Sequence, residues 1–205
     1  MKINPKELDP VNRRLFMGSV ICPRPIGWIT SVGKSGVINL APYSLFSLVS
    51  YGPIPIVFVT PHRVRKGNEI KKKDTLRNIE QTREFVVNVV TENLAEAMNV
   101  TARAYPSEIS EVEKAGLTTI PSDLVKPPRI AESPINLECK LSQIIELGAP
   151  KVSEQMVLAE VLRVHVWDEL VITGSIDINS LHVIGRMGHN KYTSTRDLFN
   201  LPEPG

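Results

Sequence analysis

Two segments of the sequence hold residues that could bind a small polar molecule. The first combines residues 24–31 with residues 39–46, where hydroxyl and amide side chains gather beside Trp28 and Tyr43. Prolines bend the expected strand ends here, which leaves backbone groups unpaired and available to a ligand. A flat ligand with apolar faces and polar edges needs walls of this kind. For each residue taken alone, the alternative is a strand pair whose tryptophan packs in the core and whose Ser and Thr form turns.

The second segment is Lys73-Asp74-Thr75, at the start of a predicted helix. A helix N-terminus presents free N–H groups and about half a positive charge, so an added ammonium and hydroxyl group would complete a phosphate site. The negative charge of Asp74 opposes a phosphate. We therefore expect Asp74 to cap the helix, while Lys73, Thr75 and the backbone contact the anion. The alternative is an ordinary helix cap beside a solvated lysine.

Spacing excludes several other kinds of catalytic site. Gly33-Lys34-Ser35 resembles the end of a phosphate-binding loop, but the first glycine of that motif would fall at position 28, which is Trp28. The sequence holds no GxGxxG after a strand, no HExxH and no GxSxG. The four histidines form no tight ligand cluster, and pairs of Asp and Glu fall on charged stretches that we expect to be solvated. The chemistry is therefore expected to depend on a bound cofactor, with no catalytic side chain and no metal.

The elements that position these segments are mostly strands. Runs of apolar and β-branched residues predict strands at 26–32, 37–40, 55–60 and 85–90. The first two are joined by Gly33-Lys34-Ser35-Gly36 and form a hairpin, and the third is expected to be buried. The helix that begins at Asp74 is indicated by Leu76 and Ile79, which fall three residues apart on one face.

Other helices are expected to be few and short, because 16 prolines are spread along the chain. An amphipathic helix is predicted over 93–104, with Leu94, Ala97, Met98 and Thr101 on one side. Residues 111–115 predict a single helical turn, and the remainder up to Pro134 reads as loop.

The second half of the chain shows the clearest alternation. The expected dry and wet faces of one strand are Ile135, Leu137, Cys139 and Leu141 against Asn136, Glu138, Lys140 and Ser142. A second strand alternates Leu162, Val164 and Val166 with Arg163 and His165, and Gly148-Ala149-Pro150 supplies a bend between the two. One wet face on each strand indicates an antiparallel sheet, and closure into a small barrel would remove its exposed edges. Cys139 is expected to be a core residue.

The composition fits one domain that spans residues 1–205. Lys and Arg number 24 against 22 Asp and Glu, so the formal charge of +2 does not favour nucleic-acid binding. Two cysteines are too few for a disulfide framework, which makes a reducing cytoplasm the default compartment. The apolar stretch after Arg13-Arg14 ends at Pro23, which is too short for an export signal or a membrane span.

Taken together, the two segments resemble the flavin reductase-like proteins of the FMN-binding split barrel. The matching stretches are residues 24–31, residues 39–44, Lys73-Asp74-Thr75 with Asn78-Ile79, residues 84–88, and Gly185-Arg186-Met187-Gly188 with Tyr192. Their order and spacing also fit, over about residues 20–188. The resemblance implies a mainly β fold, an antiparallel split β-barrel with a few peripheral helices, that binds FMN.

The resemblance also implies which residues would contact the cofactor. Trp28, Thr30 and Ser31 would lie along the flavin, and its ring and ribityl chain would be bordered by Asn39, Ala41, Pro42, Tyr43 and Ser44. Lys73 and Thr75 would bind the phosphate. Arg186 and Tyr192 belong to a late segment that in relatives approaches the flavin or the neighbouring subunit. One departure is His189, which stands where a further glycine is expected and could narrow the nicotinamide side of the pocket.

The function implied by this resemblance is an NAD(P)H-dependent flavin reductase. NADH or NADPH would be a transient donor, a monooxygenase or redox protein would be the acceptor, and the chain would form a homodimer with FMN near the interface. Two alternatives stay open. One is a flavoredoxin-like electron carrier that retains FMN, and the other is a flavin-binding module without catalytic activity.

Overall fold

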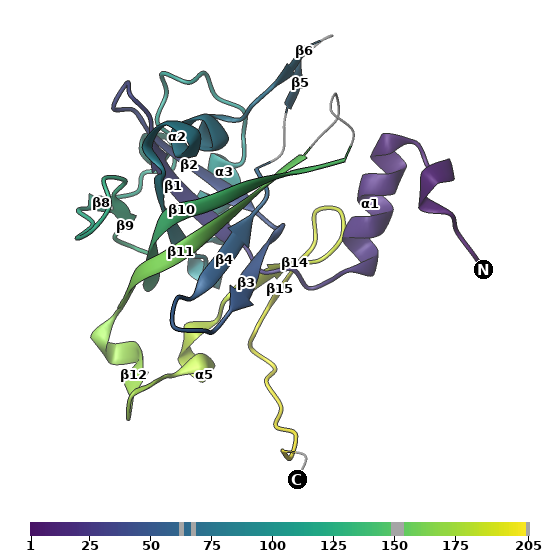
Figure 1. The fold of residues 1–205 in the computed structure, drawn as a ribbon. Coiled ribbons are helices and arrows are strands. Elements are labelled where there is room, and N and C mark those ends of the chain that lie inside the picture. The colour runs from purple at the N-terminus through teal and green to yellow at the C-terminus, as the bar shows by residue number, and fades with distance from the viewer. Residues whose placement is uncertain (62–63, 67–68, 149–153, 204–205) are drawn as a thin grey trace.

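A seven-stranded antiparallel sheet forms the centre of the molecule (Figure 1). The computed structural model describes residues 1–61, 64–66, 69–148 and 154–203. The strands of this sheet are β1 (Gly27–Val32), β2 (Ile38–Tyr43), β3 (Phe46–Ser50), β4 (Ile56–Val59), β7 (Glu84–Val89), β10 (Ile135–Leu147) and β11 (Glu154–Val166). Their spatial order is β2-β1-β7-β10-β11-β4-β3. The mainly β, antiparallel prediction is confirmed.

The sheet curls because its two edge strands are consecutive in the chain. β2 ends at Tyr43 and β3 begins at Phe46, so only Ser44 and Leu45 separate the two edges. Within the described residues β2 and β3 are not paired with each other, which leaves a barrel that is split rather than closed. The long strands β10 and β11 supply the curvature, with irregular register next to Glu138 and Leu141.

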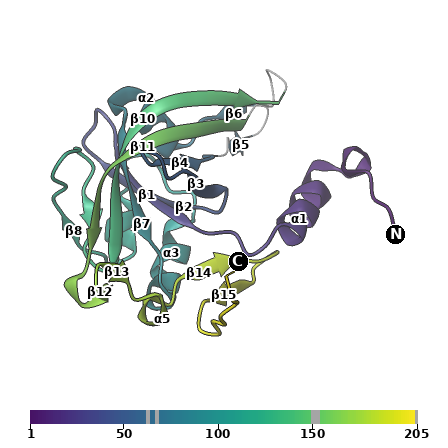
Figure 2. The same ribbon diagram turned by 60° about the horizontal axis from the view of Figure 1, so that its bottom comes forward.

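Short elements decorate this sheet. The remaining strands form four two-stranded pairs: β5 (Val64–Lys66) with β6 (Glu69–Lys71), β8 (Thr119–Ile120) with β9 (Arg129–Ile130), β12 (Val171–Ile172) with β13 (Ser175–Ile176), and β14 (Ile184–Arg186) with β15 (Tyr192–Ser194). The helices are α1 (Pro10–Val20), α2 (Asp74–Thr82), α3 (Ala95–Thr101), α4 (Glu111–Lys114) and α5 (Ile178–Leu181), with 3-10 turns η1 (Pro5–Glu7), η2 (Glu92–Leu94) and η3 (Asp168–Leu170). Helix α1 buries none of its residues and lies beside the barrel (Figures 1 and 2).

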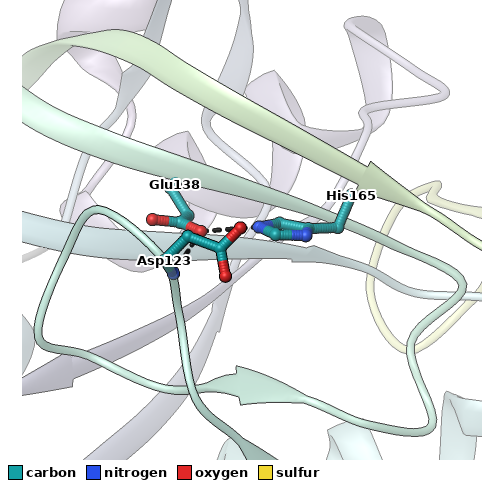
Figure 3. Close-up of side chains that lie close together, drawn as sticks. All are labelled: Asp123, Glu138 and His165. Atoms are coloured by element: carbon teal, nitrogen blue, oxygen red, sulfur yellow. Dashed lines mark hydrogen bonds and ion pairs between the residues drawn. The ribbon is translucent and has the colours of Figure 1, made fainter.

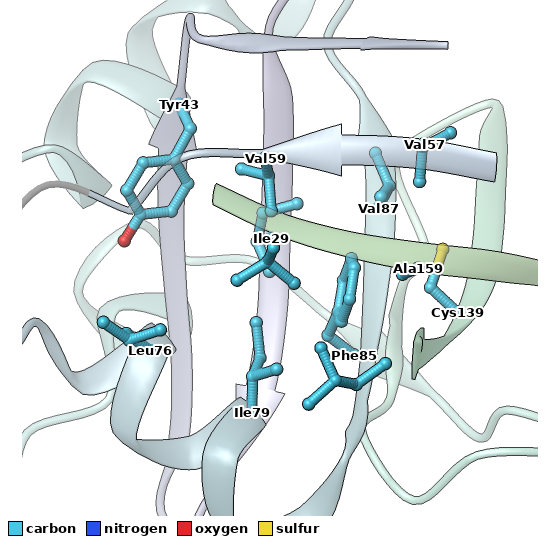
Figure 4. Packing of buried hydrophobic residues seen from close by; sticks show 12 residues of the cluster. Ile29, Tyr43, Val57, Val59, Leu76, Ile79, Phe85, Val87, Cys139 and Ala159 are labelled. Atoms are coloured by element: carbon cyan, nitrogen blue, oxygen red, sulfur yellow. The ribbon is translucent and has the colours of Figure 1, made fainter. Parts of the chain in front are cut away.

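Two hydrophobic clusters lie on opposite faces of the sheet. The first fills the inside of the curl, where α2 contributes Leu76 and Ile79 against Phe85, Val87 and their neighbours (Figure 4). Burying each such side chain contributes roughly 1.5–3 kcal/mol. The second cluster, which includes Trp28, packs the other face against α3 and α4. Cys139 belongs to the first cluster and is fully buried, as predicted.

Several predicted elements agree with the structure in place and type. The hairpin of β1 and β2 and the strand β7 are where the sequence indicates, and Leu94, Met98 and Thr101 are buried together. The predicted helix over 93–104 is divided into η2 and the shorter α3. The segment 111–134 contains the single turn α4, as expected, and also the β8–β9 pair, which the sequence analysis did not predict. The predicted bend reaches beyond Gly148 into residues 149–150, which lie outside the described part of the chain.

Three burial predictions were wrong, each because of what covers the strand. β4 is buried on one face only, since Val57 and Val59 face the core while its other residues are half-buried. Leu162 and Val164 are exposed, because β4 covers β11 only up to Glu160. On β10 Lys140 and Ser142 are exposed as predicted, whereas Asn136 and Glu138 are the reverse case, buried where a wet face was expected.

Candidate functional site

A cluster of buried polar side chains joins the β1–β2 hairpin to the start of α2. Asn39 Nδ2 donates to Thr75 Oγ1 at 2.8 Å and lies 3.4 Å from Ser31 Oγ. The hydroxyl of Tyr43 also donates to Thr75 Oγ1, at 2.8 Å, and Asn78 Nδ2 donates to Ser31 Oγ at 3.2 Å. The structure therefore brings together four of the predicted cofactor residues around the Thr75 hydroxyl.

Register explains why these residues meet. Ser31 pairs with Asn39 and Gly27 pairs with Tyr43 across the hairpin, so all of them point to the sheet face that α2 covers. Burial raises the pKa of the Tyr43 phenol, and its hydrogen bond to Thr75 only partly opposes this shift. The phenol is therefore a neutral hydrogen-bond donor in this cluster.

Lys73 stands at the N-terminus of α2 as its N-cap residue. No side chain among the described residues caps this helix end, so the N–H groups of its first turn point outward without a side-chain partner. Lys73 Nζ lies 5.3 Å from the centre of the Tyr43 ring. Burial lowers the pKa of this ammonium group and the charge of Arg14 lowers it further, while Glu111 and Asp74 oppose the shift. An anion bound here would compensate the cost of holding a partly desolvated cation.

Asp74 does not cap the helix, and this prediction was wrong. It is the first residue inside α2, and its carboxylate forms an ion pair with Arg77 and accepts a hydrogen bond from Ser107 Oγ at 2.9 Å. Those two contacts hold its negative charge next to a cation. The phosphate site predicted from Lys73, Thr75 and backbone N–H groups is therefore less opposed by Asp74 than the sequence suggested. The donors present fit a phosphate group.

Trp28 and Thr30 lie on the other face of β1, away from this cluster. Trp28 is fully buried in the second hydrophobic cluster and donates from Nε1 to Thr101 Oγ1 at 2.9 Å. Thr30 is also fully buried and accepts from Asn88 Nδ2 at 2.7 Å. For Trp28 the structure favours the core alternative, because adjacent residues of a strand point to opposite faces.

The remaining residues of the first segment border the cluster. Ala41 shares its sheet face and packs against the first hydrophobic cluster, while Pro42 pairs with Trp28 on the opposite face. Ser44 is half-buried directly after the end of β2. Ala41 and Ser44 are thus placed near Tyr43, and Pro42 is turned away.

Arg186 and Tyr192 lie on the β14–β15 hairpin, which α3 separates from the α2 end of the barrel (Figure 2). The Arg186 guanidinium lies 4.7 Å from the centre of the Tyr192 ring and donates to its hydroxyl. Both residues line a cavity of about 560 Å³ beside α3. Within one chain the structure does not bring them to the Thr75 cluster.

The departure at His189 has a structural counterpart. His189 adopts φ +52°, a left-handed conformation that favours glycine, and its carbonyl accepts from Arg186. Its side chain is exposed. The backbone therefore keeps the conformation that the expected glycine would provide, although a histidine occupies the position.

A second polar cluster was missed by the sequence analysis (Figure 3). Glu138 was expected on a wet face but is fully buried, because residues 121–130 fold over β10. Its carboxylate accepts from three backbone N–H groups, those of Asp123, Leu124 and Val125, and contacts His165 Nε2 at 2.6 Å. Asn136 is buried beside it and donates to Asn88. The prediction that Asn136 and Glu138 lie on a solvated face was therefore wrong.

This cluster anchors a loop and does not resemble a metal site in use. Asp123, Glu138 and His165 have their ligand atoms within 4.8 Å of one another. However, Asp123 Oδ2 is paired with Arg163 at 2.5 Å, and the oxygens of Glu138 already accept the N–H groups of the loop. Burial raises the pKa of Glu138, but the hydrogen bonds from the loop and His165 outweigh it and hold the pKa below its usual range. Glu138 is therefore a charged structural anchor.

Comparison with known proteins assigns the chain to a family. The model of the flavin reductase-like domain matches residues 17–174. The uncharacterized protein BH2278 of Halalkalibacterium halodurans is 39% identical over 100% of this chain and 97% of its own length. The crystal structure of nitrilotriacetate monooxygenase component B from Bacillus cereus is 35% identical, with a TM-score of 0.91 and 98% of each chain covered. A split-barrel protein from Shewanella frigidimarina, 24% identical, has a TM-score of 0.82 over 98% of this chain and 96% of its own, which supports the fold alone.

Proposed function

The chain belongs to the flavin reductase-like family, and from that premise we propose that it binds FMN and passes a hydride from NADH or NADPH to it. A bound flavin accepts a hydride at N5 and later releases the electrons to an acceptor. The family itself supports a flavin-dependent oxidoreductase. The FMN preference, the nicotinamide donor and the acceptor are our proposals, and the acceptor would be a monooxygenase or another redox protein.

The observation that carries the proposal is Lys73 at the uncapped N-terminus of α2, two residues before Thr75 and beside the Tyr43 ring. An ammonium group, free backbone N–H groups and a helix dipole together favour a phosphate monoester. Asn39 and Tyr43 hold the Thr75 side chain in place through two hydrogen bonds of 2.8 Å. In this proposal Lys73 binds the phosphate and the hairpin residues Ala41 and Ser44 border the ribityl chain and ring.

A second copy of the chain is proposed to complete the site. Helix α1 carries exposed apolar side chains such as Met17 and Val20 and buries none of its residues. Arg186 and Tyr192 lie on the β14–β15 hairpin and contact each other rather than the Thr75 cluster of their own chain, so we propose that a partner subunit presents them. We therefore propose a homodimer. We also propose a cytoplasmic location, in keeping with the two cysteines of the chain, which are both free. Among the described residues, no helix has the length and apolar character that crossing a bilayer requires.

The phosphate assignment is tested by comparing FMN with riboflavin, which lacks the phosphate. Lys73→Ala is expected to raise the Kd for FMN about tenfold to a hundredfold, since a charge-assisted hydrogen bond contributes roughly 1.5–3 kcal/mol. Riboflavin binding should be unchanged. Lys34→Ala, an exposed lysine in the hairpin turn, is the matched control. Calorimetric titrations measure both affinities. An equal loss of affinity for FMN and riboflavin, or no loss of affinity for FMN, would contradict the phosphate assignment.

The two alternatives are separated by anaerobic reduction. Bleaching of the bound flavin by NADH or NADPH with turnover of added FMN supports the reductase. Bleaching without turnover supports a flavoredoxin-like carrier that retains its FMN. The absence of both bleaching and turnover supports a flavin-binding module. Testing each nicotinamide separately also establishes which donor is used.

A further inference from the structure

An uncharged stretch of the chain forms the open edge of the central sheet at β3. Residues 35–61 include no Asp, Glu, Lys, Arg or His, and β3 lies within this stretch. Large apolar side chains are exposed along β3 and next to it: Leu45, Leu48, Val49, Tyr51 and Ile54. Exposed apolar side chains that gather in one region, with no charges between them, are typical of an interaction surface.

The backbone of this edge is also unpaired. β3 pairs with β4 on one side, and no described residue pairs with it on the other. An edge strand presents a row of free N–H and C=O groups, which natural proteins usually protect with charged side chains, prolines, a bulge or a covering segment. β3 contains no charge and no proline, and it has one irregularity, next to Val49. We therefore expect a segment of chain to cover it.

Residues 197–203, which we call the C-terminal arm, have matching properties. The whole arm is exposed, and its large apolar side chains Leu198, Phe199 and Leu201 are 44%, 81% and 77% exposed. Within the described chain the arm forms no hydrogen bond, and it runs away from the barrel after β15 (Figure 1). Such an apolar segment gains free energy when another surface removes it from water.

The root of the arm is held in place, and the arm is long enough to cover β3. The backbone N–H of Thr195 donates to the carbonyl of Val183 at 3.0 Å, and Arg196 Nε donates to the Glu92 carboxylate at 2.7 Å. Pro202 favours an extended conformation for the residue before it. When extended, the arm spans roughly 23 Å, whereas β3 with its 5 residues spans roughly 17 Å.

We propose that the C-terminal arm of one subunit lies along β3 of a second copy of the chain, which returns the same contact. The Phe199 side chain packs against Leu48 and Val49 of the partner, and the arm backbone forms hydrogen bonds with the free edge. Within one chain Leu48, Val49 and Phe199 are all exposed, so the arm does not cover its own β3. A reciprocal exchange closes after two subunits. The contact presupposes the homodimer proposed above and locates the surface that the second copy uses.

The contact is continuous with the proposed flavin site. On one chain the arm begins soon after Tyr192, which the partner subunit is proposed to present to the Thr75 cluster. On the other chain β3 begins soon after Tyr43, a member of that cluster. One surface can therefore hold both contacts.

The area of this contact is sufficient for a stable dimer. An aromatic side chain such as Phe199 buries about 150–250 Å². With its two leucines and its backbone, each arm buries on the order of 400 Å² and covers an equal area of the partner, so a reciprocal pair of arms buries roughly 1,600 Å². This is the ordinary size of a specific protein–protein interface.

The test measures dimerisation of the full-length protein by sedimentation velocity. Phe199→Ser and Leu48→Lys are each expected to raise the Kd for dimerisation at least about tenfold. Ile178→Ser, which removes an exposed apolar side chain from α5, is the control and should leave the Kd unchanged. A monomeric wild type overturns both the homodimer and the arm contact. An unchanged Kd for either variant overturns the arm contact alone, and the FMN titrations described above test flavin binding independently of both.

A cross-link identifies the partner of the arm without relying on a loss of stability. In a Cys22→Ser background, Leu48→Cys together with Phe199→Cys is expected to form a disulfide between two chains on mild oxidation, since the two positions lie side by side in the dimer. Each single cysteine variant in that background is the control and should remain a single chain on a denaturing gel. A disulfide within one chain, or no disulfide, would overturn the proposal.

Discussion

Replacing Glu138 by Gln is expected to destabilise the protein by about 3 kcal/mol. One carboxylate oxygen accepts the N–H groups of Leu124 and Val125, and the other accepts that of Asp123 and contacts His165. A glutamine amide must present its NH₂ group to one of these two sets. In the better orientation one buried backbone N–H loses its acceptor, which costs roughly 1–3 kcal/mol. The two hydrogen bonds that remain lose their charge assistance, roughly a further 1 kcal/mol.

For a chain of this length each kcal/mol corresponds to about 2–4 °C in Tm, so Glu138→Gln should lower the Tm by roughly 6–12 °C at pH 7. Calorimetry or circular dichroism measures the change, with the exposed Glu108→Gln as the control. A decrease of less than about 2 °C would refute the reasoning, because it would mean that the loop over β10 does not depend on the carboxylate.

The same anchor predicts a pH dependence. The hydrogen bonds from the loop and His165 hold the pKa of Glu138 below its ordinary value of 4.5 in the folded protein, although burial opposes them. A lowered folded-state pKa contributes stability that is fully present above the unfolded value and is lost as the pH falls through the folded value. The Tm difference between wild type and Glu138→Gln should therefore narrow as the pH falls below 4.5. A difference that grows as the pH falls below that value contradicts the assignment.

Two further pairs of substitutions test the left-handed backbone at His189 and the assignment of β1 side chains to the two sheet faces. His189→Gly should raise the stability by about 0.5 kcal/mol, because it relieves the left-handed backbone at φ +52°, and Asn190→Gly should not; a thermal melt that shows no gain for His189→Gly contradicts this. Thr30→Val should cost about 1–2 kcal/mol, since Asn88 Nδ2 loses one of its two acceptors and keeps the Trp28 carbonyl, yet it should leave FMN affinity unchanged. Asn39→Leu, by contrast, should weaken FMN binding by releasing Thr75. Urea unfolding measures the stability of both variants, and flavin titration measures their affinity. If Thr30→Val weakened FMN binding as much as Asn39→Leu, the assignment of these two residues to different sheet faces would be contradicted.

The sequence predicted the strands well, because alternation is a local property of the chain. The dry face of β10 was correct, and Cys139 and Leu141 lie in the core. Its wet face was correct at Lys140 and Ser142, which are exposed, and wrong at Asn136 and Glu138, because polar side chains on a strand look the same whether water or a folded loop covers them. Glu138 accepts N–H groups of a segment before β10, and Asn136 donates to Ile130 in the same segment as well as to Asn88 on β7. No local pattern indicates the path of that segment. The only sequence signal was the unusual density of prolines between Glu111 and Pro134, which marked a shaped loop without showing where it packs.

At the helix start, the sequence identified the right position and the wrong role for one residue. Lys73, Asp74 and Thr75 do form the N-terminus of α2, as predicted. Asp74 was expected to cap because aspartate commonly does so. The cap would have competed with a stronger partner, since Arg77 stands one turn later on the same face and pairs with the carboxylate. The preference of aspartate for the N-cap position was outweighed by the ion pair with Arg77, a residue three positions later in the sequence.

The first segment shows why a sequence motif on a strand predicts only about half of the residues of a binding site, since alternate side chains point to opposite faces. Residues 24–31 resemble a flavin-binding stretch as a block, yet β1 turns every second side chain away from α2. Ser31 joins the Thr75 cluster, whereas Trp28 and Thr30 bind Thr101 and Asn88 on the opposite face. The second group keeps the hairpin fixed to β7 and α3, so the register that aligns Ser31 with Asn39 depends on it. The residues of the motif that lie outside the Thr75 cluster are therefore the ones that hold the face of that cluster in position.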